Sequence, residues 1–462
     1  MGTRASWPVP EQVEVLVRAG KLFDWTPQCL TGSPVRPSFL QASPAISDRL
    51  DTQSDPRPLV PMARSLARSF VSPALLVLLS AVACGSVRKR HPLPKELADE
   101  AVIPGIPDAR YWGDKSWIHA RNLVAMSKED LQKNYAGTFG VPHNYLAISG
   151  GGSNGAYGAG LLCGWSARGD RPKFTIVTGI STGALTAPFA FLGSGYDARL
   201  KEVFTSYSTK DLIRERSLLA AVTGDSFSDT APLARLIERY MTQDMLDKIA
   251  AEHRTGRRLW IATTHLDAER PVIWDIGRIA NSGAPNRLEI FRKVLLASAS
   301  IPIAFPPVSF EVEARGQRYD ELHVDGGATA QVFLYPLGLD WHRVWARLEV
   351  PGKPGVYLIR NAWLSPRWST TDPADLFGIA TRTTDSLIRS QGIGDLYRIY
   401  LGTKRDGLEF HMSSIPEDFD HETKEAFDRE YMRALFERGY ERARNGYPWL
   451  RYPPGVDPEH DE

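Results

Sequence analysis

The sequence predicts an α/β fold with a mainly parallel central sheet. Strand-like and helix-like segments alternate from Asn144 to about Val350, and glycine-rich turns join them. The composition, 43% hydrophobic and 24% charged, is that of a globular protein. The 462 residues are enough for one large core or for two or three domains.

Residues 1–61 carry recurring prolines and no sustained hydrophobic period, which predicts a disordered or mis-assigned N-terminal extension. Residues 62–84 look like a signal peptide that starts at Met62, with a basic start, the apolar run 74–79 and small residues before Cys84. The apolar run is too short to span a membrane comfortably. The lipoprotein resemblance described next implies that Met62 is the true start.

The stretch Ala81-Val82-Ala83-Cys84 resembles a bacterial lipoprotein box, with Ala81 where such a box prefers Leu. The resemblance implies that Cys84 is lipidated, becomes the first mature residue and anchors the chain to a membrane of the bacterial cell envelope. The alternatives are a plain secretory signal, which implies a secreted or periplasmic protein, and a short buried helix.

Residues 85–142 are polar and carry several prolines, so we expect a linker and lead-in, with Ser127 capping a short helix. Residues 143–345 are the expected catalytic domain. Its predicted elements are the strands Tyr145–Ser149, Lys173–Ile180, Arg258–Thr264 and Pro271–Ile276, the helices Gly155–Ala167 and Thr182–Leu192, and amphipathic helices between Tyr196 and His253.

Residues 346–462 continue the pattern and predict a C-terminal α/β extension packed on the catalytic domain. The expected elements are the strand Gly355–Ala362, the helix Ala374–Ser390, the strands Leu396–Leu401 and Leu408–Met412, and a charged helix from about His421 to Arg444.

Ser181 stands in a Gly-x-Ser-x-Gly stretch, with Gly179 and Gly183 on either side, between a strand-like and a helix-like run. In that context the turn pushes the serine side chain out of the backbone at the end of a strand. Small flanking residues let the helix begin close to the preceding strand. Ser181 is therefore the predicted nucleophile.

Two further motifs fit an acyl-transfer site. Glycines at the start of a helix leave N–H groups uncovered, which is how proteins hold an anion. We expect an oxyanion hole around Gly150, Gly151, Gly152 and Gly155, with the N–H groups of Gly151 and Gly152 as donors. The second motif, Asp325-Gly326-Gly327, places a carboxylate on a glycine turn at the end of a strand.

In this order the three motifs resemble those of the patatin-like lipid acyl hydrolases. Residues 296–308 also look like that family's segment between the Gly-x-Ser-x-Gly turn, called the nucleophile elbow, and the Asp-Gly-Gly turn. The resemblance covers residues 143–345. It implies a three-layer sandwich that cleaves fatty acyl esters through a dyad of Ser181 and Asp325 and an acyl-enzyme. Asn154 stands where the family has Arg or Lys, so no cationic side chain is expected beside the glycine loop.

Asp325 is a weak base at its ordinary pKa, so the dyad needs that pKa raised by burial. The alternative is an α/β-hydrolase triad that adds His342, with His265 and His323 also near the catalytic region. The glycine loop also matches a dinucleotide fingerprint, but Asp170 lies at the start of the second strand rather than its end. A non-catalytic lipid-binding protein is the remaining alternative.

The composition indicates which classes of ligand and partner are expected. The net charge of +1 gives no indication of nucleic-acid binding. The three cysteines, Cys29, Cys84 and Cys163, show neither a disulfide framework nor zinc spacing. We expect no metal and no cofactor, and a membrane lipid or another acyl ester as substrate.

Overall fold

The structure, a computed structural model, describes residues 90–457 except 116–117, 216–227, 303, 335–339, 369, 371, 373–374 and 448. Cys84 and the rest of the predicted signal peptide lie outside the described residues. Residues from Ser86 to Glu462 group as one compact unit. The expected extension 346–462 therefore belongs to the same unit as the catalytic region.

Within the described residues the main sheet has nine strands, in the order β1-β7-β6-β3-β2-β10-β11, with β9 pairing with β6 and β8 with β9. The neighbouring strands β6, β3, β2, β10 and β11 run parallel to one another. The main-sheet strands are β1 Arg110–Trp112, β2 Asn144–Ile148, β3 Ile176–Gly179, β6 Arg258–His265, β7 Arg270–Asp275, β8 Val308–Ala314, β9 Gln317–Asp325, β10 Gly355–Arg360 and β11 Glu409–Ser414. The sheet is therefore mixed: the parallel strands expected from the sequence form its central part, whereas β1, β7, β8 and β9 pair antiparallel with their neighbours.

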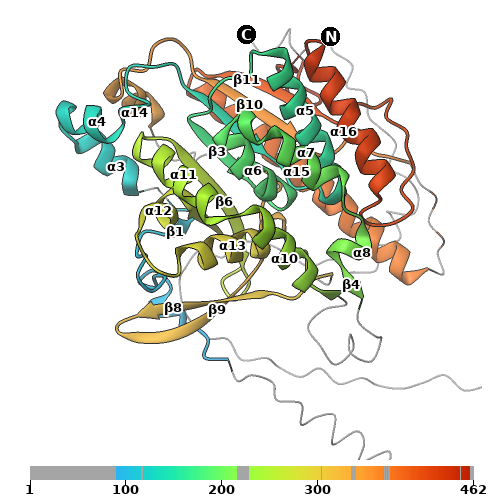
Figure 1. The fold of residues 1–462 in the computed structure, drawn as a ribbon, viewed down its shortest axis with the longest axis horizontal. Coiled ribbons are helices and arrows are strands. Elements are labelled where there is room, and N and C mark those ends of the chain that lie inside the picture. The colour runs from blue at the N-terminus through green and yellow to red at the C-terminus, as the bar shows by residue number, and fades with distance from the viewer. Residues whose placement is uncertain are drawn as a thin grey trace, which may run out of the picture. The chain divides into compact units, whose positions relative to one another are not determined.

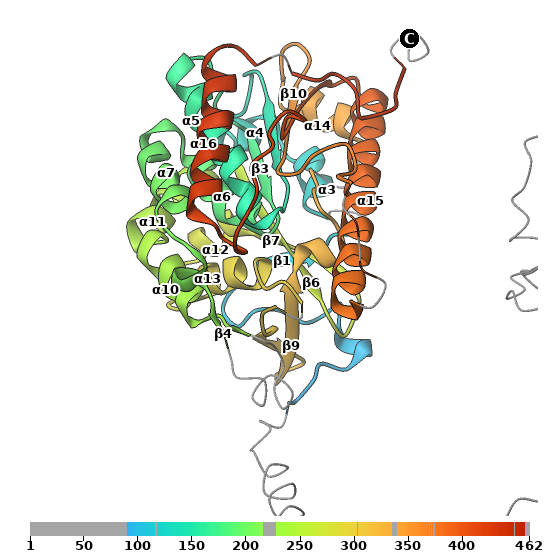
Figure 2. The same ribbon diagram turned by 90° about the vertical axis from the view of Figure 1, so that its right-hand side faces the viewer.

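Helices cover both faces of this sheet, as Figure 1 and Figure 2 show. Side chains of β2 alternate between two cores: Leu146 and Ile148 pack on one face, and Tyr145 and Ala147 on the other. The predicted three-layer arrangement is therefore present. The helices are α3 Ile118–Ala125, α4 Lys128–Asn134, α5 Gly155–Arg168, α6 Thr182–Leu192, α7 Asp197–Thr205, α8 Thr209–Leu212, α10 Ala231–Tyr240, α11 Gln243–Arg254, α12 Ile276–Asn281, α13 Arg287–Ser298, α14 Trp341–Arg347, α15 Leu376–Arg405 and α16 Arg429–Arg444. A separate pair of short strands joins β4 Arg214–Glu215 to β5 Ser228–Asp229.

The strand predicted at Leu396–Leu401 is wrong, because these residues belong to α15. Leu396, Ile399 and Tyr400 are buried, and their spacing of three and four residues is that of one helix face. The run is rich in residues that favour strands, so composition outweighed spacing in the prediction.

Two other segments differ from expectation. Residues 110–112, expected within a linker, form the edge strand β1 and pair with β7. The C-terminal charged helix begins at Arg429 rather than near His421, because the Asp428 carboxylate caps it by accepting bonds from the N–H groups of Glu430 and Tyr431. Its packing back on the core is confirmed: it lies against α5 in both views.

Candidate active site

Strand register brings Ser181 and Asp325 together. β3 ends with Gly179 opposite Ile261 of β6. Beyond that point the same edge of β6 pairs with β9, which runs the other way and places Asp325 opposite Thr263. Thr263 is two residues past Ile261, and Ser181 is two residues past Gly179. The carboxylate and the elbow serine therefore meet at the carboxyl end of β3.

Ser181 adopts the strained conformation expected of an elbow, with φ 54° and ψ −124°. No room exists for larger neighbours: a Cβ on Gly179 would lie 2.4 Å from the Gly183 carbonyl oxygen, and one on Gly183 would lie 2.3 Å from that of Ile148. α6 starts at Thr182, directly after the serine. Both motif glycines are thus explained by close backbone approach.

Asp325 is buried, 4% exposed, at the end of β9. Its Oδ1 accepts a 2.7 Å hydrogen bond from the Gly327 N–H. Burial raises the pKa of Asp325 to about 7, against the opposing effects of the Ser181 side chain and that N–H group. The carboxyl group therefore titrates near neutral pH, as a general base requires.

Asp325 Oδ2 makes no hydrogen bond of ordinary length and angle within the described residues. Ser181 nevertheless lies close enough to lower the carboxyl pKa. The two side chains are therefore adjacent without a formed hydrogen bond, an arrangement common in catalytic pairs before substrate binds.

The glycine loop supplies the two free donors expected from the sequence. The N–H groups of Gly151 and Gly152 donate to no group in the described part of the chain. In contrast, the Gly150 N–H donates to the Gln331 carbonyl oxygen at 3.1 Å, and the Gly155 N–H donates to the Gly152 carbonyl oxygen. The predicted donors Gly151 and Gly152 remain available. The N–H groups of Gly150 and Gly155, included in the predicted oxyanion hole, are bonded within the protein, so these two residues shape the loop.

Close packing explains why these positions are glycines. A Cβ on Gly151 would lie 2.3 Å from the Asn361 carbonyl oxygen, and one on Gly155 would lie 2.1 Å from Thr182 Oγ1. Asn154 occupies the position where the family has Arg or Lys. Its Oδ1 accepts a 2.5 Å hydrogen bond from the hydroxyl of Tyr431 on α16.

A family model described as Patatin-like phospholipase matches residues 146–337. These residues form a patatin-like phospholipase domain. The solved structure of VipD from Legionella pneumophila matches with 12% identity and a TM-score of 0.34, covering 66% of each chain. The present chain thus spans about two thirds of the length of that protein. The curated proteins contain no significant match.

Ser298 and Ser300, which the sequence analysis did not single out, fix the backbone of the candidate site through hydrogen bonds. The Ser181 N–H donates to Ser298 Oγ at 3.0 Å, and that hydroxyl donates to the Ala262 carbonyl oxygen at 2.7 Å. The Asp325 N–H donates to the Ser300 carbonyl oxygen at 2.9 Å. The end of α13 therefore fixes the backbone of both candidate catalytic residues. Ser298 lies in the family-like segment 296–308, which was the available signal.

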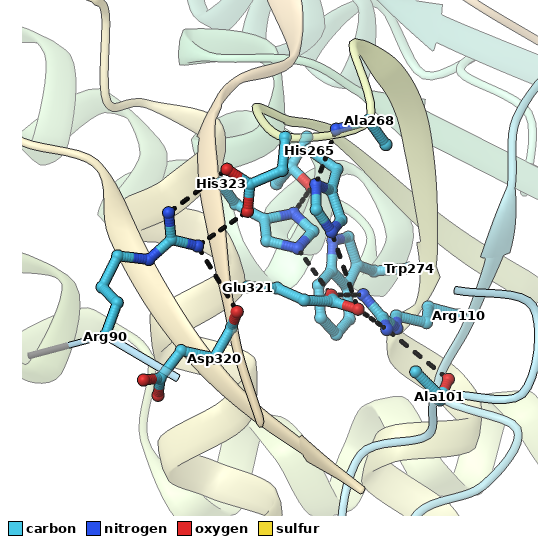
Figure 3. A network of polar contacts seen from close by, with 11 residues as sticks. Arg90, Ala101, Arg110, His265, Ala268, Trp274, Asp320, Glu321 and His323 are labelled. Carbon is cyan, nitrogen blue, oxygen red and sulfur yellow. Dashed lines mark hydrogen bonds and ion pairs between the residues drawn. The ribbon is translucent and has the colours of Figure 1, made fainter. Parts of the chain in front are cut away.

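His265 and His323 belong to a buried ion-pair network next to the site (Figure 3). Glu321 lies between them, 3.6 Å from His265 Nε2 and 3.2 Å from His323 Nε2. Arg110 holds both carboxylate oxygens of Glu321. Burial opposes the charge of Glu321, but Arg110 and the two imidazoles outweigh it and hold the glutamate pKa well below its usual range.

The same three side chains, His265, Glu321 and His323, form a metal-like group whose ligand atoms lie within 4.8 Å of one another. The Arg110 guanidinium already neutralises the carboxylate and would repel a divalent cation. Both ring nitrogens of His323 are already engaged, Nδ1 with Thr263 Oγ1 at 2.9 Å and Nε2 with Glu321 at 3.2 Å. We interpret the group as a structural network rather than a metal centre.

No histidine among the described residues hydrogen-bonds to Ser181 or Asp325. His342 lies on α14, where its ring contacts Trp345 in the core on the face of the sheet away from α5 and α6. The triad with His342 therefore has no geometric support.

The dinucleotide-binding alternative needs an acidic residue at the end of the second strand. Asp170 instead precedes β3 and pairs with Arg168, so that acidic residue is not at the strand end.

A narrow apolar pocket of ≈ 60 Å³ opens beside Ser181 and Gly152. Its walls come mainly from α6, α7 and α10 and include Thr182, Leu185, Phe204, Leu233 and Leu236. A larger cavity of ≈ 490 Å³, lined by Trp260, Val332 and Asp395 among others, contains neither Ser181 nor Asp325. The chemistry therefore identifies the smaller pocket as the candidate substrate site.

Proposed function

We propose that the protein is a serine lipid acyl hydrolase of phospholipase A type, which works through a Ser181–Asp325 dyad and an acyl-enzyme intermediate. The observation that carries the proposal is the strained elbow serine beside a buried carboxyl group whose pKa is raised to about 7. The free N–H groups of Gly151 and Gly152 and the apolar pocket support it.

In the proposed mechanism, Ser181 Oγ attacks the ester carbonyl while Asp325 accepts the hydroxyl proton. The carbonyl oxygen becomes an oxyanion and takes hydrogen bonds from the N–H groups of Gly151 and Gly152, each worth about 3 kcal/mol in the transition state. The leaving alcohol departs with the proton from Asp325. Water then attacks the acyl-enzyme, with Asp325 again as base, and releases the fatty acid and free Ser181.

A fatty acyl chain is the group that suits the pocket, because its walls are almost entirely apolar side chains. The polar end of the ester would then lie at Ser181 and the glycine loop. Phospholipid, neutral lipid and other acyl esters share this acyl chemistry.

The test is to incubate purified protein with phospholipid, triacylglycerol and short-chain ester and to identify the released fatty acids, with Ser181→Ala as the blank. Leu236→Trp, in the pocket wall, should lower hydrolysis of long-chain esters about tenfold relative to short-chain ones. Leu387→Trp makes the same change at a position 66% exposed on α15 and should alter neither. Absence of Ser181-dependent acid release from every substrate would reject the proposal.

We also propose that Cys84 carries a lipid anchor, on the strength of the lipoprotein-like sequence around it. No helix in the described part of the chain is long and apolar enough to cross a bilayer. Expression from Met62 in a bacterial host should give a lipidated N-terminal Cys84 that sediments with membranes, since several acyl chains anchor firmly. Cys84→Ser should release the protein; an uncleaved, soluble chain would count against the anchor.

A further inference from the structure

Gln331 contacts both loops of the candidate site. Its carbonyl oxygen accepts the 3.1 Å hydrogen bond from the Gly150 N–H, at the start of the glycine loop 150–155, here called the oxyanion loop. Its side-chain Nε2 donates a 2.8 Å hydrogen bond to the Gly327 carbonyl oxygen, in the turn that follows Asp325. Gln331 is buried, 6% exposed, so water does not compete for either bond.

Asp395 holds Gln331 from α15. Its Oδ2 accepts bonds from the N–H groups of Gln331 at 2.7 Å and Val332 at 3.4 Å. The Asp395 side chain is 3% exposed, and its Oδ1 is paired with Arg398 at 3.3 Å. A charged acceptor in a buried position makes a stronger hydrogen bond than a neutral one, so this contact fixes the Gln331 backbone.

We propose that Gln331 is a positioning residue that sets the oxyanion loop against the Asp325 turn, and that Asp395 anchors it to α15. The inference rests on the proposed acyl-transfer function. It assigns to α15, which begins only at Leu376, well after the Asp-Gly-Gly motif in sequence, a direct part in the geometry of the site.

The contact with Gly327 has an electrostatic consequence. The Gly327 N–H stabilises the ionised form of Asp325 through its 2.7 Å bond to Oδ1. Loss of the Gln331 side-chain bond frees the Gly327 carbonyl and loosens that turn. A weaker N–H bond favours the protonated acid, so the pKa of Asp325 should rise further.

The first test replaces Gln331 with Met, which keeps the chain length and removes the donor. We expect kcat to fall at least about tenfold with KM within about twofold, because the defect lies in alignment rather than in substrate binding. The acid limb of kcat/KM should move to higher pH by about half a pH unit. The matched control is Gln391→Met: Gln391 accepts a 3.0 Å bond from the same Nε2 and has no hydrogen bond to either loop among the described residues, so the acid limb should stay in place.

The second test uses Asp395. Asp395→Asn keeps an acceptor for the Gln331 N–H and should retain kcat within about threefold, whereas Asp395→Ala should lose at least about tenfold. This pair decides the matter if Gln331→Met does not fold. Equal activity of the Asn and Ala variants, or an unmoved acid limb in Gln331→Met, would overturn the inference.

A readout without substrate separates this inference from the proposed function. Infrared difference spectroscopy, with Asp325→Asn as the reference, follows the carboxyl band of protonated Asp325 as pH rises. That titration should shift upward in Gln331→Met and not in Gln391→Met. If wild-type protein hydrolyses nothing but the titration shifts, the proposed function fails and the positioning role stands; an unshifted titration rejects the positioning role.

Discussion

At the residue scale, the properties of Asp325 follow from its surroundings. Burial disfavours its charge, and one N–H group from Gly327 supports it. The result is a carboxyl group that changes charge near pH 7 rather than near 4. The raised pKa of Asp325 should affect both the pH dependence of catalysis and the pH dependence of stability.

The catalytic prediction concerns pH. Only ionised Asp325 can accept the serine proton, so kcat/KM should rise with pH through about 7 and level off above it. Asp325→Asn should lower turnover by at least about 100-fold and remove this limb. His265→Ala and His342→Ala should keep the limb in variants that remain folded. A histidine variant that abolishes it would restore the triad.

The thermodynamic prediction concerns stability. The folded-state pKa of Asp325, about 7, exceeds the reference value of 3.8, so the folded protein binds this proton more tightly and loses stability as pH rises from about 4 to about 7. Asp325→Asn removes that loss. Urea denaturation at pH 8 should show the variant to be more stable by up to about 4 kcal/mol, with no gain at pH 4. A gain independent of pH would contradict the account.

The turn at Ser181, the strand-end position of Asp325 and the free N–H groups of Gly151 and Gly152 could be predicted from the sequence, because each lies in a short motif with a local structural meaning. Ser298, Gln331 and Asp395 could not be predicted in the same way. Their contacts depend on where α13 and α15 pack against the sheet. Hydrophobic periodicity predicts that a helix forms, but it does not predict which part of the protein the helix packs against.

At the element scale, α5 and α16 approach closely because glycines face the contact. A Cβ on Gly160 would lie 1.9 Å from the Phe436 carbonyl oxygen, and one on Gly164 would lie 2.1 Å from that of Tyr440. α5 begins at the end of the oxyanion loop, so this contact also supports the site.

Gly164→Ala should therefore destabilise the protein by about 2–4 kcal/mol, because α16 must move away. Gly195→Ala, where no atom lies within 4 Å of the added Cβ, should change stability by less than about 0.5 kcal/mol. Thermal or urea unfolding of both variants measures the difference. Equal effects would mean that the helices are not in tight contact.

The β9 strand depends on the ion pair between Arg110 and Glu321, whose side chains are 7% and 0% exposed. Removing the cation leaves a buried charge, so Arg110→Met should cost about 3–5 kcal/mol in urea unfolding, and adding Glu321→Gln should recover part of it. Arg90→Met breaks a pair with Asp267 that is 35% and 40% exposed and should cost less than about 1 kcal/mol. A small effect at Arg110 would show that the network is dispensable.

At the scale of the whole molecule, the catalytic region is not separable from the C-terminal residues 346–462. β10 pairs with β2 on one side and β11 on the other, and α15 and α16 lie on opposite faces of the sheet (Figure 2). The alternation of strands and helices predicted the layers and the parallel strands. It could not predict that β10 inserts beside β2, because strand order depends on long-range pairing.

A chain ending at residue 345 should therefore fail to fold, since it exposes the edge of β2 and both apolar faces that the missing elements cover. Circular dichroism and gel filtration of the truncated chain check this. A monomeric, cooperatively folding product would show that residues 346–462 are a separate addition.

If Ser181 is a nucleophile activated by Asp325, it should react with an alkyl fluorophosphonate. Peptide mass spectrometry should find one adduct, on Ser181, and the rate of labelling should rise with pH through about 7, following the ionisation of Asp325. Ser181→Ala should remain unlabelled. An adduct on another residue, or equal labelling of Ser181→Ala, would contradict the account.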